Sequence, residues 1–161
     1  MPVTLARWSE DDFDLLVRMN TPEMTVFLGG SETPAQLVDR QERYLRAWSL
    51  GSGHMFRIDV DADPAGGIGY WEVEHDGHPA FETGWSVLPE FQGRGVAGEA
   101  LRQLIDSAQA DGRRDLLVAY PGVDNPASNA LCRHAGFAAQ GEKTMPWRGG
   151  ELTFRIWTLA L

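Results

Sequence analysis

The chain has 161 residues, a length that fits one ordinary domain and is short for two, so we expect a single domain over residues 1–161. Its hydrophobic and charged fractions, 43% and 23%, are typical of a globular protein, and no apolar run approaches the ~20 residues of a membrane-spanning helix. The N-terminus lacks the basic start and apolar stretch of a signal peptide, so we expect a cytoplasmic location and no membrane partner. The formal charge of −9 argues against a nucleic-acid partner and would attract a cationic one.

The first third of the chain is predicted to contain one strand and two helices. Residues Val3–Trp8 alternate in polarity as a strand does, and Ser9–Asp12 resembles a capping box that opens a helix to about Met19. The second helix has a clearer start. Thr33–Gln36 offers an N-cap threonine, a proline at the first helical position and a glutamine that can reach back to the cap. Apolar residues follow at helical spacing until Gly51–Gly53 ends the helix.

The middle of the chain changes to an alternation of period two, which predicts an antiparallel meander. Asp63-Pro64 and Asp76-Gly77 interrupt the alternation and are typical of turns. The predicted strands are residues 54–60, 66–74 and 80–87.

The C-terminal half is predicted to contain two helices, a strand and a hairpin. Asp111-Gly112 closes the first of these helices, Asn125-Pro126 opens the second with asparagine as its cap, and Arg148–Gly150 forms the hairpin turn. The predicted elements are a helix over 95–110, a strand over 115–120, a helix over 126–135 and a hairpin of 141–145 with 151–159.

The sharpest signal in the sequence is a glycine-rich segment that enters a helix. Glycines let the backbone approach a ligand closely, and the free amides and positive dipole end of a helix stabilise negative charge. The segment therefore predicts a site for a diphosphate. Its residues are Gln92, Gly93, Arg94, Gly95, Val96, Ala97 and Gly98.

The three glycines of this segment also match the letters of a dinucleotide-binding fingerprint, G-x-G-x-x-G. However, they follow Leu88–Phe91 and do not come directly off a strand. The next predicted strand ends at Val118–Tyr120 without the carboxylate that binds a ribose, and the preceding strands form no βαβ unit. A dinucleotide oxidoreductase and a purely structural glycine turn are therefore the less favoured alternatives.

Two motifs resemble the GNAT superfamily of acyl-CoA-dependent N-acetyltransferases. That family's loop reads Gln or Arg, two residues, Gly, one residue, Gly or Ala, and Gln92–Ala97 has this order. Asn125–Phe137 resembles the family's Asn-x-x-Ser helix that ends in Gly-Phe. The run Gly84–Gly95 is similar to the branch that acetylates the N-termini of ribosomal proteins.

The resemblance implies an α+β fold with a mixed, mostly antiparallel sheet of about seven strands and about four flanking helices. The sheet would splay between the strands near Val87 and Leu117. The pantetheine arm of acetyl-CoA, the expected co-substrate, would enter this gap and bond the backbone around Val87 and Leu88 as an added strand does. Its pyrophosphate would lie on the amides of Gln92–Gly98.

Glu82 is the candidate catalytic base. Acetyl transfer to an amine needs a neutral nucleophile, so a base must take its proton. Several family members place a base or a water-holding glutamate at this point of the strand, and apolar neighbours such as Phe81 and Trp85 would raise its pKa. The alternative is a solvated carboxylate or a cross-strand partner for an arginine. Glu72, on the preceding strand, is the reserve candidate.

The acid that protonates the departing thiolate is harder to assign. Many members of the family use a tyrosine that would fall at Cys132, where this sequence departs from the pattern. The ribosomal-protein branch suggests Ser128 near the thioester sulfur, with a role as helix cap as the alternative. Cys132 shares the helix face of Ser128 but is favoured as a small buried hydrophobe. Asn125 is expected to cap its helix and also to contact the cofactor.

The acceptor side is defined only by resemblance. Residues 25–33 and the hairpin near 146–150 are expected to surround an amine acceptor, on a small molecule or a protein N-terminus. The ribosomal-protein branch often forms dimers, so a homodimer is possible. The missing tyrosine motivates an alternative function, a CoA-binding or regulatory module without turnover.

No metal is expected. Cys132 is the only cysteine, which excludes an intrachain disulfide and a thiolate cluster. His75 and His78 flank the predicted turn at Asp76-Gly77 and are interpreted as solvated loop residues.

Overall fold

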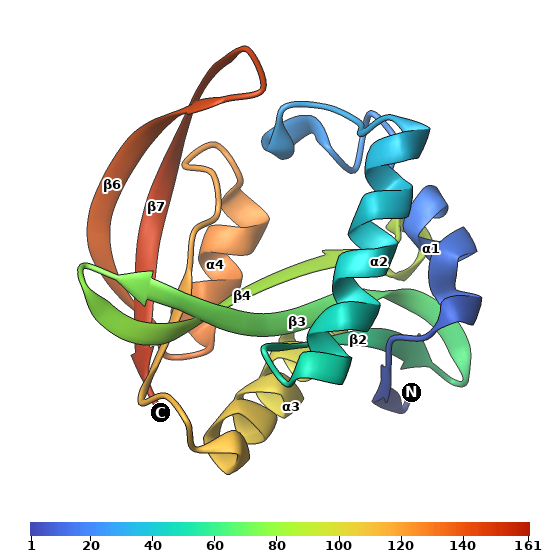
Figure 1. Ribbon diagram of the computed structural model, residues 1–161, viewed down its shortest axis with the longest axis horizontal. Helices are drawn as coiled ribbons and strands as arrows, with labels where there is room; N and C mark the ends of the chain where they lie inside the picture. Colours follow the sequence, from blue (N-terminus) through green and yellow to red (C-terminus); the bar gives the residue numbers. More distant parts are fainter.

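The computed structural model describes residues 1–161 as one seven-stranded sheet flanked by four α-helices (Figure 1). The strands lie in the order β1-β2-β3-β4-β5-β7-β6, and every neighbouring pair is antiparallel except β4 and β5. The expected α+β fold with a mixed, mostly antiparallel sheet is confirmed. None of the helices is long and apolar enough to span a bilayer.

The elements follow the predicted order along the chain. The strands are β1 (Val3–Arg7), β2 (Gly53–Val60), β3 (Asp63–His75), β4 (His78–Val87), β5 (Leu116–Ala119), β6 (Ala138–Trp147) and β7 (Gly150–Ala160). The α-helices are α1 (Phe13–Arg18), α2 (Pro34–Leu50), α3 (Val96–Asp111) and α4 (Pro126–His134). Three 3-10 turns complete the fold: η1 (Glu10–Asp12), η2 (Val26–Leu28) and η3 (Pro89–Phe91).

Local chemistry explains where the helices and turns begin. Thr33 accepts a hydrogen bond from the amide of Gln36, whose side chain accepts one from the amide of Thr33, so the predicted capping box is present at α2. Ser9 forms a second capping box, which opens η1 ahead of α1. Asp76 and Gly77 have φ values of 50° and 75°, the conformation that a two-residue hairpin turn between β3 and β4 requires.

Two hydrophobic clusters hold the helices against the sheet. The larger cluster joins one face of the central strands to α3, where Leu101 and Leu104 are fully buried, and to α4. Burial of each leucine is worth about 1.5–3 kcal/mol, so the helix that begins at the glycine-rich segment is firmly anchored. The smaller cluster joins α1 and α2 to Trp8 and Met55 on the other face.

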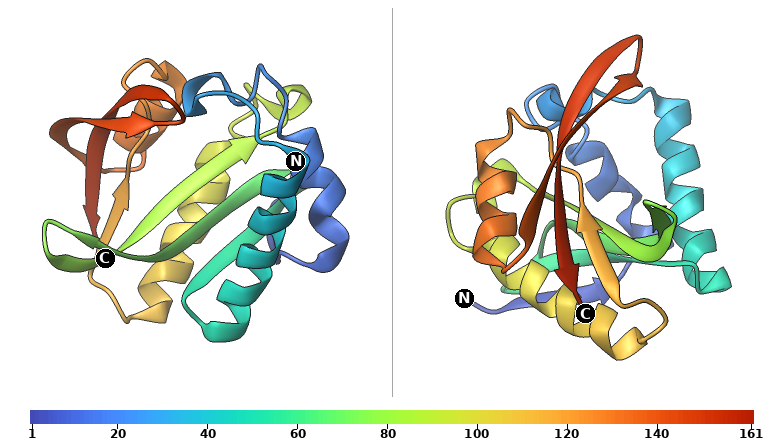
Figure 2. Two further views of the ribbon diagram at one scale, coloured as in Figure 1. Left: turned by 45° about the horizontal axis from the view of Figure 1, so that its top comes forward. Right: turned by 90° about the vertical axis from the view of Figure 1, so that its left-hand side faces the viewer.

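The parallel pair β4–β5 is held together over only two rungs. Phe81 pairs with Leu117 and Glu82 with Val118, after which β4 continues to Val87 without β5 beside it. Figure 2 (left) shows the two strands diverging from a common start near the C-terminus. The predicted splay of the sheet is therefore present, and Glu82 occupies its closed end.

Candidate active site

The glycine-rich segment forms an open backbone site at the start of α3. Gly93 and Gly95 have φ values of 74° and 77°, and Gly95 is the N-cap of α3 with no side chain bonded to the cap. A Cβ atom added at either glycine would meet nothing within 4 Å. The first amides of the helix, Val96, Ala97 and Gly98, have no intrahelical partner, and their dipoles favour an anion. These amides are therefore open to an anion such as a phosphate group.

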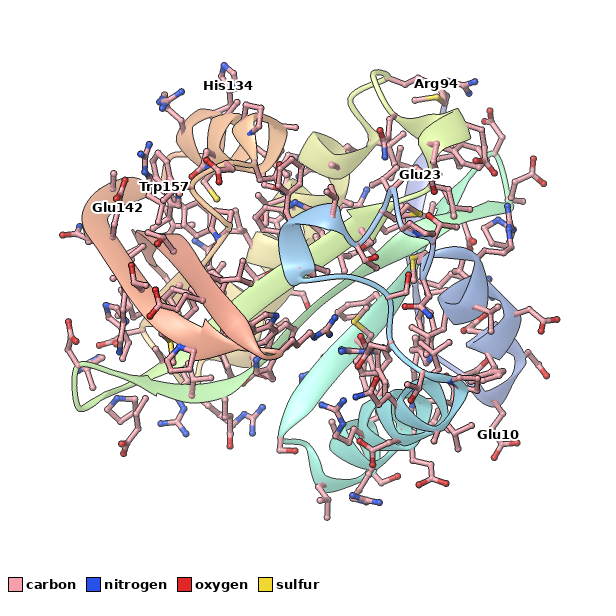
Figure 3. All side chains as sticks on the ribbon, turned by 90° about the horizontal axis from the view of Figure 1, so that it is seen from above. Glu10, Glu23, Arg94, His134, Glu142 and Trp157 are labelled. Carbon is pink, nitrogen blue, oxygen red and sulfur yellow. The ribbon has the colours of Figure 1, made fainter.

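The flanks of this loop are held by their own contacts. Arg94 lies at the outer edge of the molecule (Figure 3), with its guanidinium 5.7 Å from the ring centre of Phe91. The side-chain amide of Gln92 turns back and donates to the carbonyl of Val87 at 2.9 Å. Gln92 therefore joins the loop to the end of β4 through its side chain, while its backbone continues into the loop.

The open edge of β4 carries backbone groups that β5 does not use. Successive residues of a strand direct their N–H and C=O groups to opposite neighbours. Leu88 donates its amide to Ala65 at 2.8 Å, on the β3 side. Beyond the last β4–β5 rung, Val87 and Trp85 therefore present their backbone groups toward the gap. Of the two residues expected to bond the pantetheine arm, Leu88 has its amide paired within the sheet, and Val87 has an amide that is open to a ligand.

Glu82 stands at the closed end of the gap. Trp71 is its cross-strand partner on β3, so the two side chains share the face covered by α2. Burial raises the pKa of the Glu82 carboxyl group to about 7, and an interaction with the Trp71 side chain offsets only part of this shift. A carboxyl group with this pKa exchanges a proton near neutral pH, as a general base must.

Glu72 lies elsewhere. It alternates onto the opposite face of β3, where its carboxylate is 2.8 Å from Arg113 and 3.7 Å from Arg114. The reserve candidate is thus committed to ion pairs with the α3–β5 connection, away from the face that holds Glu82.

Ser128 is connected to β4 through an indole. Trp85 donates its Nε1–H to the Ser128 hydroxyl at 3.2 Å, and the Ser128 amide donates to the side chain of Asn125 at 3.1 Å. Asn125 is therefore the cap of α4, as expected. The hydroxyl hydrogen of Ser128 has no acceptor in the protein and can be donated to a ligand in the gap.

Cys132 lies one turn further along α4 and is fully buried. Burial raises the pKa of its thiol to about 12, so the group stays protonated and unreactive. The structure supports the interpretation of Cys132 as a small core residue.

Thr83 is a residue that the sequence alone did not single out. It is 3% exposed, follows the last β4–β5 rung, and its hydroxyl has no hydrogen-bonding partner. Leaving such a group unpaired costs about 1–3 kcal/mol, which a ligand in the gap would recover. A threonine on a strand carries no sequence signal of this kind.

The acceptor side is bridged by contacts between two distant segments. The Trp147 indole donates to the carbonyl of Leu28 at 2.7 Å, and Arg148 donates to the carbonyl of Gly30 and lies 3.7 Å from Glu32. We call these five residues the strap. Figure 1 shows the β6–β7 turn and the η2 segment facing each other across the top of the fold.

A cavity of about 220 Å³ adjoins the strap. It combines apolar walls with the carboxylates of Asp124 and Glu151. Its lining residues are Val26, Phe27, Gly122, Val123, Asp124, Glu151, Leu152 and Thr153. A larger hollow of about 330 Å³ lies at the opposite end of the sheet between His78 and Arg113, far from the glycine-rich loop, and has no hydrophobic residue in its lining. No three His, Cys, Asp or Glu side chains are grouped to hold a metal ion.

A mixed sheet that opens between two parallel strands, beside a glycine-rich helix start, is the architecture of acyl-CoA-dependent transferases. Residues 3–138 match the family described as the acetyltransferase (GNAT) domain. The chain belongs to this family.

Solved structures share the fold over almost the whole chain. An acetyltransferase from Salmonella typhimurium that modifies the N-terminal serine of ribosomal protein L7/L12 has a TM-score of 0.84 at 19% identity, with 99% of this chain and 95% of that chain covered. A ribosomal-protein-alanine N-acetyltransferase from Brucella melitensis has a TM-score of 0.81 at 23% identity, with 98% and 99% covered. A spermidine N-acetyltransferase from Vibrio cholerae, in complex with CoA and spermine, has a TM-score of 0.79 at 18% identity, with 98% and 95% covered. These likenesses show the fold and agree with the resemblance seen in the sequence.

Proposed function

We propose that the protein transfers the acetyl group of acetyl-CoA to a primary amine by direct attack in a ternary complex. The observation that carries this proposal is the position of Glu82, a carboxyl group with a pKa of about 7 at the closed end of the β4–β5 gap. A base of this kind at the end of a thioester channel suits the deprotonation of an amine.

The cofactor would occupy the loop and the gap together. Its pyrophosphate would accept hydrogen bonds from the amides of Gly93–Gly98, and its pantetheine arm would pair with the open edge of β4 at Val87 and Trp85. Asn125 would lie beside the arm from α4. This arrangement points the thioester toward Glu82 and Ser128, which approach the gap from opposite faces of the sheet.

The chemistry needs one proton acceptor and one hydrogen-bond donor. An aliphatic amine has a pKa near 10.4 and arrives protonated, so Glu82 removes a proton to free its lone pair. The amine attacks the carbonyl carbon, the C–S bond breaks, and the second proton leaves the nitrogen for the departing sulfur, to which the Ser128 hydroxyl donates a hydrogen bond. The amide, free CoA thiol and one proton are the products.

A covalent acyl-enzyme is not part of this proposal. Cys132 is fully buried with a thiol pKa of about 12, and a nucleophilic cysteine needs an accessible thiolate. Direct attack therefore fits the site better than transfer through Cys132.

The acceptor is a primary amine on a small molecule or a protein N-terminus. The Salmonella and Brucella relatives are named for protein acceptors and the Vibrio relative for a polyamine. Asp124 and Glu151 at the cavity beside the strap, together with the net charge of −9, favour an acceptor that carries positive charge.

The proposal is tested by the release of CoA thiol from acetyl-CoA across a panel of polyamines, aminoglycosides and short peptides with free N-termini. Release that depends on the amine is the expected result. Binding of acetyl-CoA without release for any amine would favour the CoA-binding module that the buried cysteine, in place of a tyrosine, also suggests.

A further inference from the structure

His75 and Tyr120 form a close polar contact near the active site. The Nδ1 atom of His75 lies 2.7 Å from the Tyr120 hydroxyl, and the ring centres are 5.9 Å apart. His75 is the last residue of β3 and Tyr120 directly follows β5, so the pair spans the sheet across β4. His75 is therefore not the freely solvated turn residue that the sequence predicts.

The alternation of side chains along the strands places this pair on the same face of the sheet as Glu82. Trp71 is the partner of Glu82 on β3, and His75 lies four residues further on the same face. Val118 is the partner of Glu82 on β5, and Tyr120 lies two residues beyond it on the same face, from where its hydroxyl reaches back to His75. The three polar side chains thus share the face that α2 covers.

The electrostatics agree with this placement. Burial, followed by the negative charge of Glu82 and then that of Asp76, raises the pKa of Tyr120 to about 12. Tyr120 therefore keeps its proton at neutral pH, so its oxygen can accept one proton while its own proton leaves. The His75 side chain is 14% exposed, and its Nε2 lies 3.6 Å from the carboxylate of Asp76, which is 93% exposed. The path from Tyr120 through His75 ends in solvent.

The proposed reaction needs such a path. Each turnover of a protonated amine leaves one proton on Glu82, which must lose it before the next cycle. Glu82 is partly buried in the free protein, and a cofactor and acceptor in the gap would cover it further, which would limit its direct exchange with water during turnover.

We propose that Tyr120 and His75 carry this proton from Glu82 to solvent. The Glu82 carboxylic acid gives its proton to the Tyr120 oxygen, directly or through one bridging water. The phenolic proton passes at the same time to Nδ1 of His75, which starts in the tautomer protonated at Nε2. The imidazolium then releases its Nε2 proton to water beside Asp76, and exchange with solvent restores the starting tautomer.

The inference rests on the proposed role of Glu82, and two conservative variants test it. Tyr120→Phe keeps the ring and removes the hydroxyl, and His75→Gln removes the imidazole ring. Each should lower kcat about tenfold with an unchanged KM for acetyl-CoA, and the double variant should lose little more than either single one, because one route is broken in each case. His78→Gln is the matched control. His78 is the cross-strand partner of His75, but it is exposed and pairs with Asp115. The kcat of His78→Gln should therefore stay at the wild-type value.

A titration of the Glu82 side chain by carbon-13 NMR gives a second readout that needs no turnover. Loss of the Tyr120 hydroxyl should shift the Glu82 pKa, and His78→Gln should leave it in place. Wild-type kcat in both Tyr120→Phe and His75→Gln, or an unmoved Glu82 titration in Tyr120→Phe, would overturn the relay. The acetyltransferase proposal would stand in that case, because amine-dependent thiol release by the wild-type protein is measured in the same assay. Absence of that release in the wild type would overturn both.

Discussion

The cofactor side and the acceptor side of this protein are built in different ways. The cofactor loop lies on α3, which buries five of its residues in the core, and its shape depends on glycines that are neighbours in sequence. The acceptor side depends on the strap, in which Trp147 contacts a residue 119 positions away, and on β6, whose ten residues are all exposed. The proposed cofactor side therefore depends on contacts that are local in the sequence, whereas the proposed acceptor side depends on contacts between distant segments.

The largest expected effect comes from the carboxylate between the two sides. Glu82→Gln should lower kcat about 100-fold while both substrates still bind, because a positioned general base contributes about that much or more. The wild-type rate should fall below about pH 7, where the carboxylate becomes protonated, and Glu82→Gln should lose this dependence. A pH profile of kcat for both proteins is the measurement, and an unchanged rate in Glu82→Gln would remove it as the base.

Acetyl-CoA binding should weaken when the backbone conformation of the glycine-rich loop is disturbed. Gly95→Val should weaken acetyl-CoA binding about 30-fold or more, since a side chain at φ 77° strains the loop and blocks close approach of the pyrophosphate. Gly112→Val is the matched control, because Gly112 has φ 72° at the other end of the same helix. Calorimetric affinities that fall equally in both variants would assign the loss to general strain.

Ser128→Ala should have a smaller effect on the same side. Loss of the hydroxyl removes one hydrogen bond to the departing sulfur, and kcat should fall about tenfold. Ser49→Ala, which removes an exposed helix hydroxyl on α2, should have no effect. Steady-state kinetics of the two variants are the measurement. A wild-type kcat in Ser128→Ala would exclude a catalytic role for the Ser128 hydroxyl.

Changes in the strap should alter the KM for the amine acceptor. Trp147→Phe keeps the ring that packs on Phe154 but loses the bond to Leu28, so the strap loosens and this KM should rise about threefold to tenfold. Acetyl-CoA affinity should not change. Trp48→Phe, which loses a bond of the same length between α2 and Met55 on β2, is the control. Equal amine KM values in all three proteins would contradict a role for the strap.

The smallest expected effect is one of stability. The folded pKa of Glu82, about 7, lies above its ordinary value of 4.5, so the folded protein keeps a proton that the unfolded chain releases between these values. Wild-type stability should therefore fall as the pH rises through this window. Glu82→Gln should unfold at a higher temperature than the wild type at pH 8, by no more than about 3 kcal/mol in free energy, and at the same temperature near pH 4. If Glu82→Gln were less stable than the wild type at pH 8, burial of the ionised Glu82 carboxylate would not destabilise the folded protein.

The sequence predicted the starts of the helices well because their signals are local. The capping box at Thr33, the cap at Asn125 and the glycines of the loop each act within a few residues, and the structure contains all three. Glu82 was predicted from resemblance, and its raised pKa depends on the burial that the fold provides.

The remaining features depend on long-range contacts. Ser128 meets Trp85 across 43 residues and His75 meets Tyr120 across 45, and no pattern of spacing or polarity encodes either contact. The free hydroxyl of Thr83 follows from the point at which β5 leaves β4, and that point is a property of the sheet.

The most direct test of the central claim is a calorimetric titration of the purified protein with acetyl-CoA. We predict one acetyl-CoA site per chain with micromolar affinity. Gly95→Val should weaken this affinity, and Glu82→Gln should retain it. Absence of binding to the wild-type protein would contradict the assignment of the loop and the β4–β5 gap as a cofactor site.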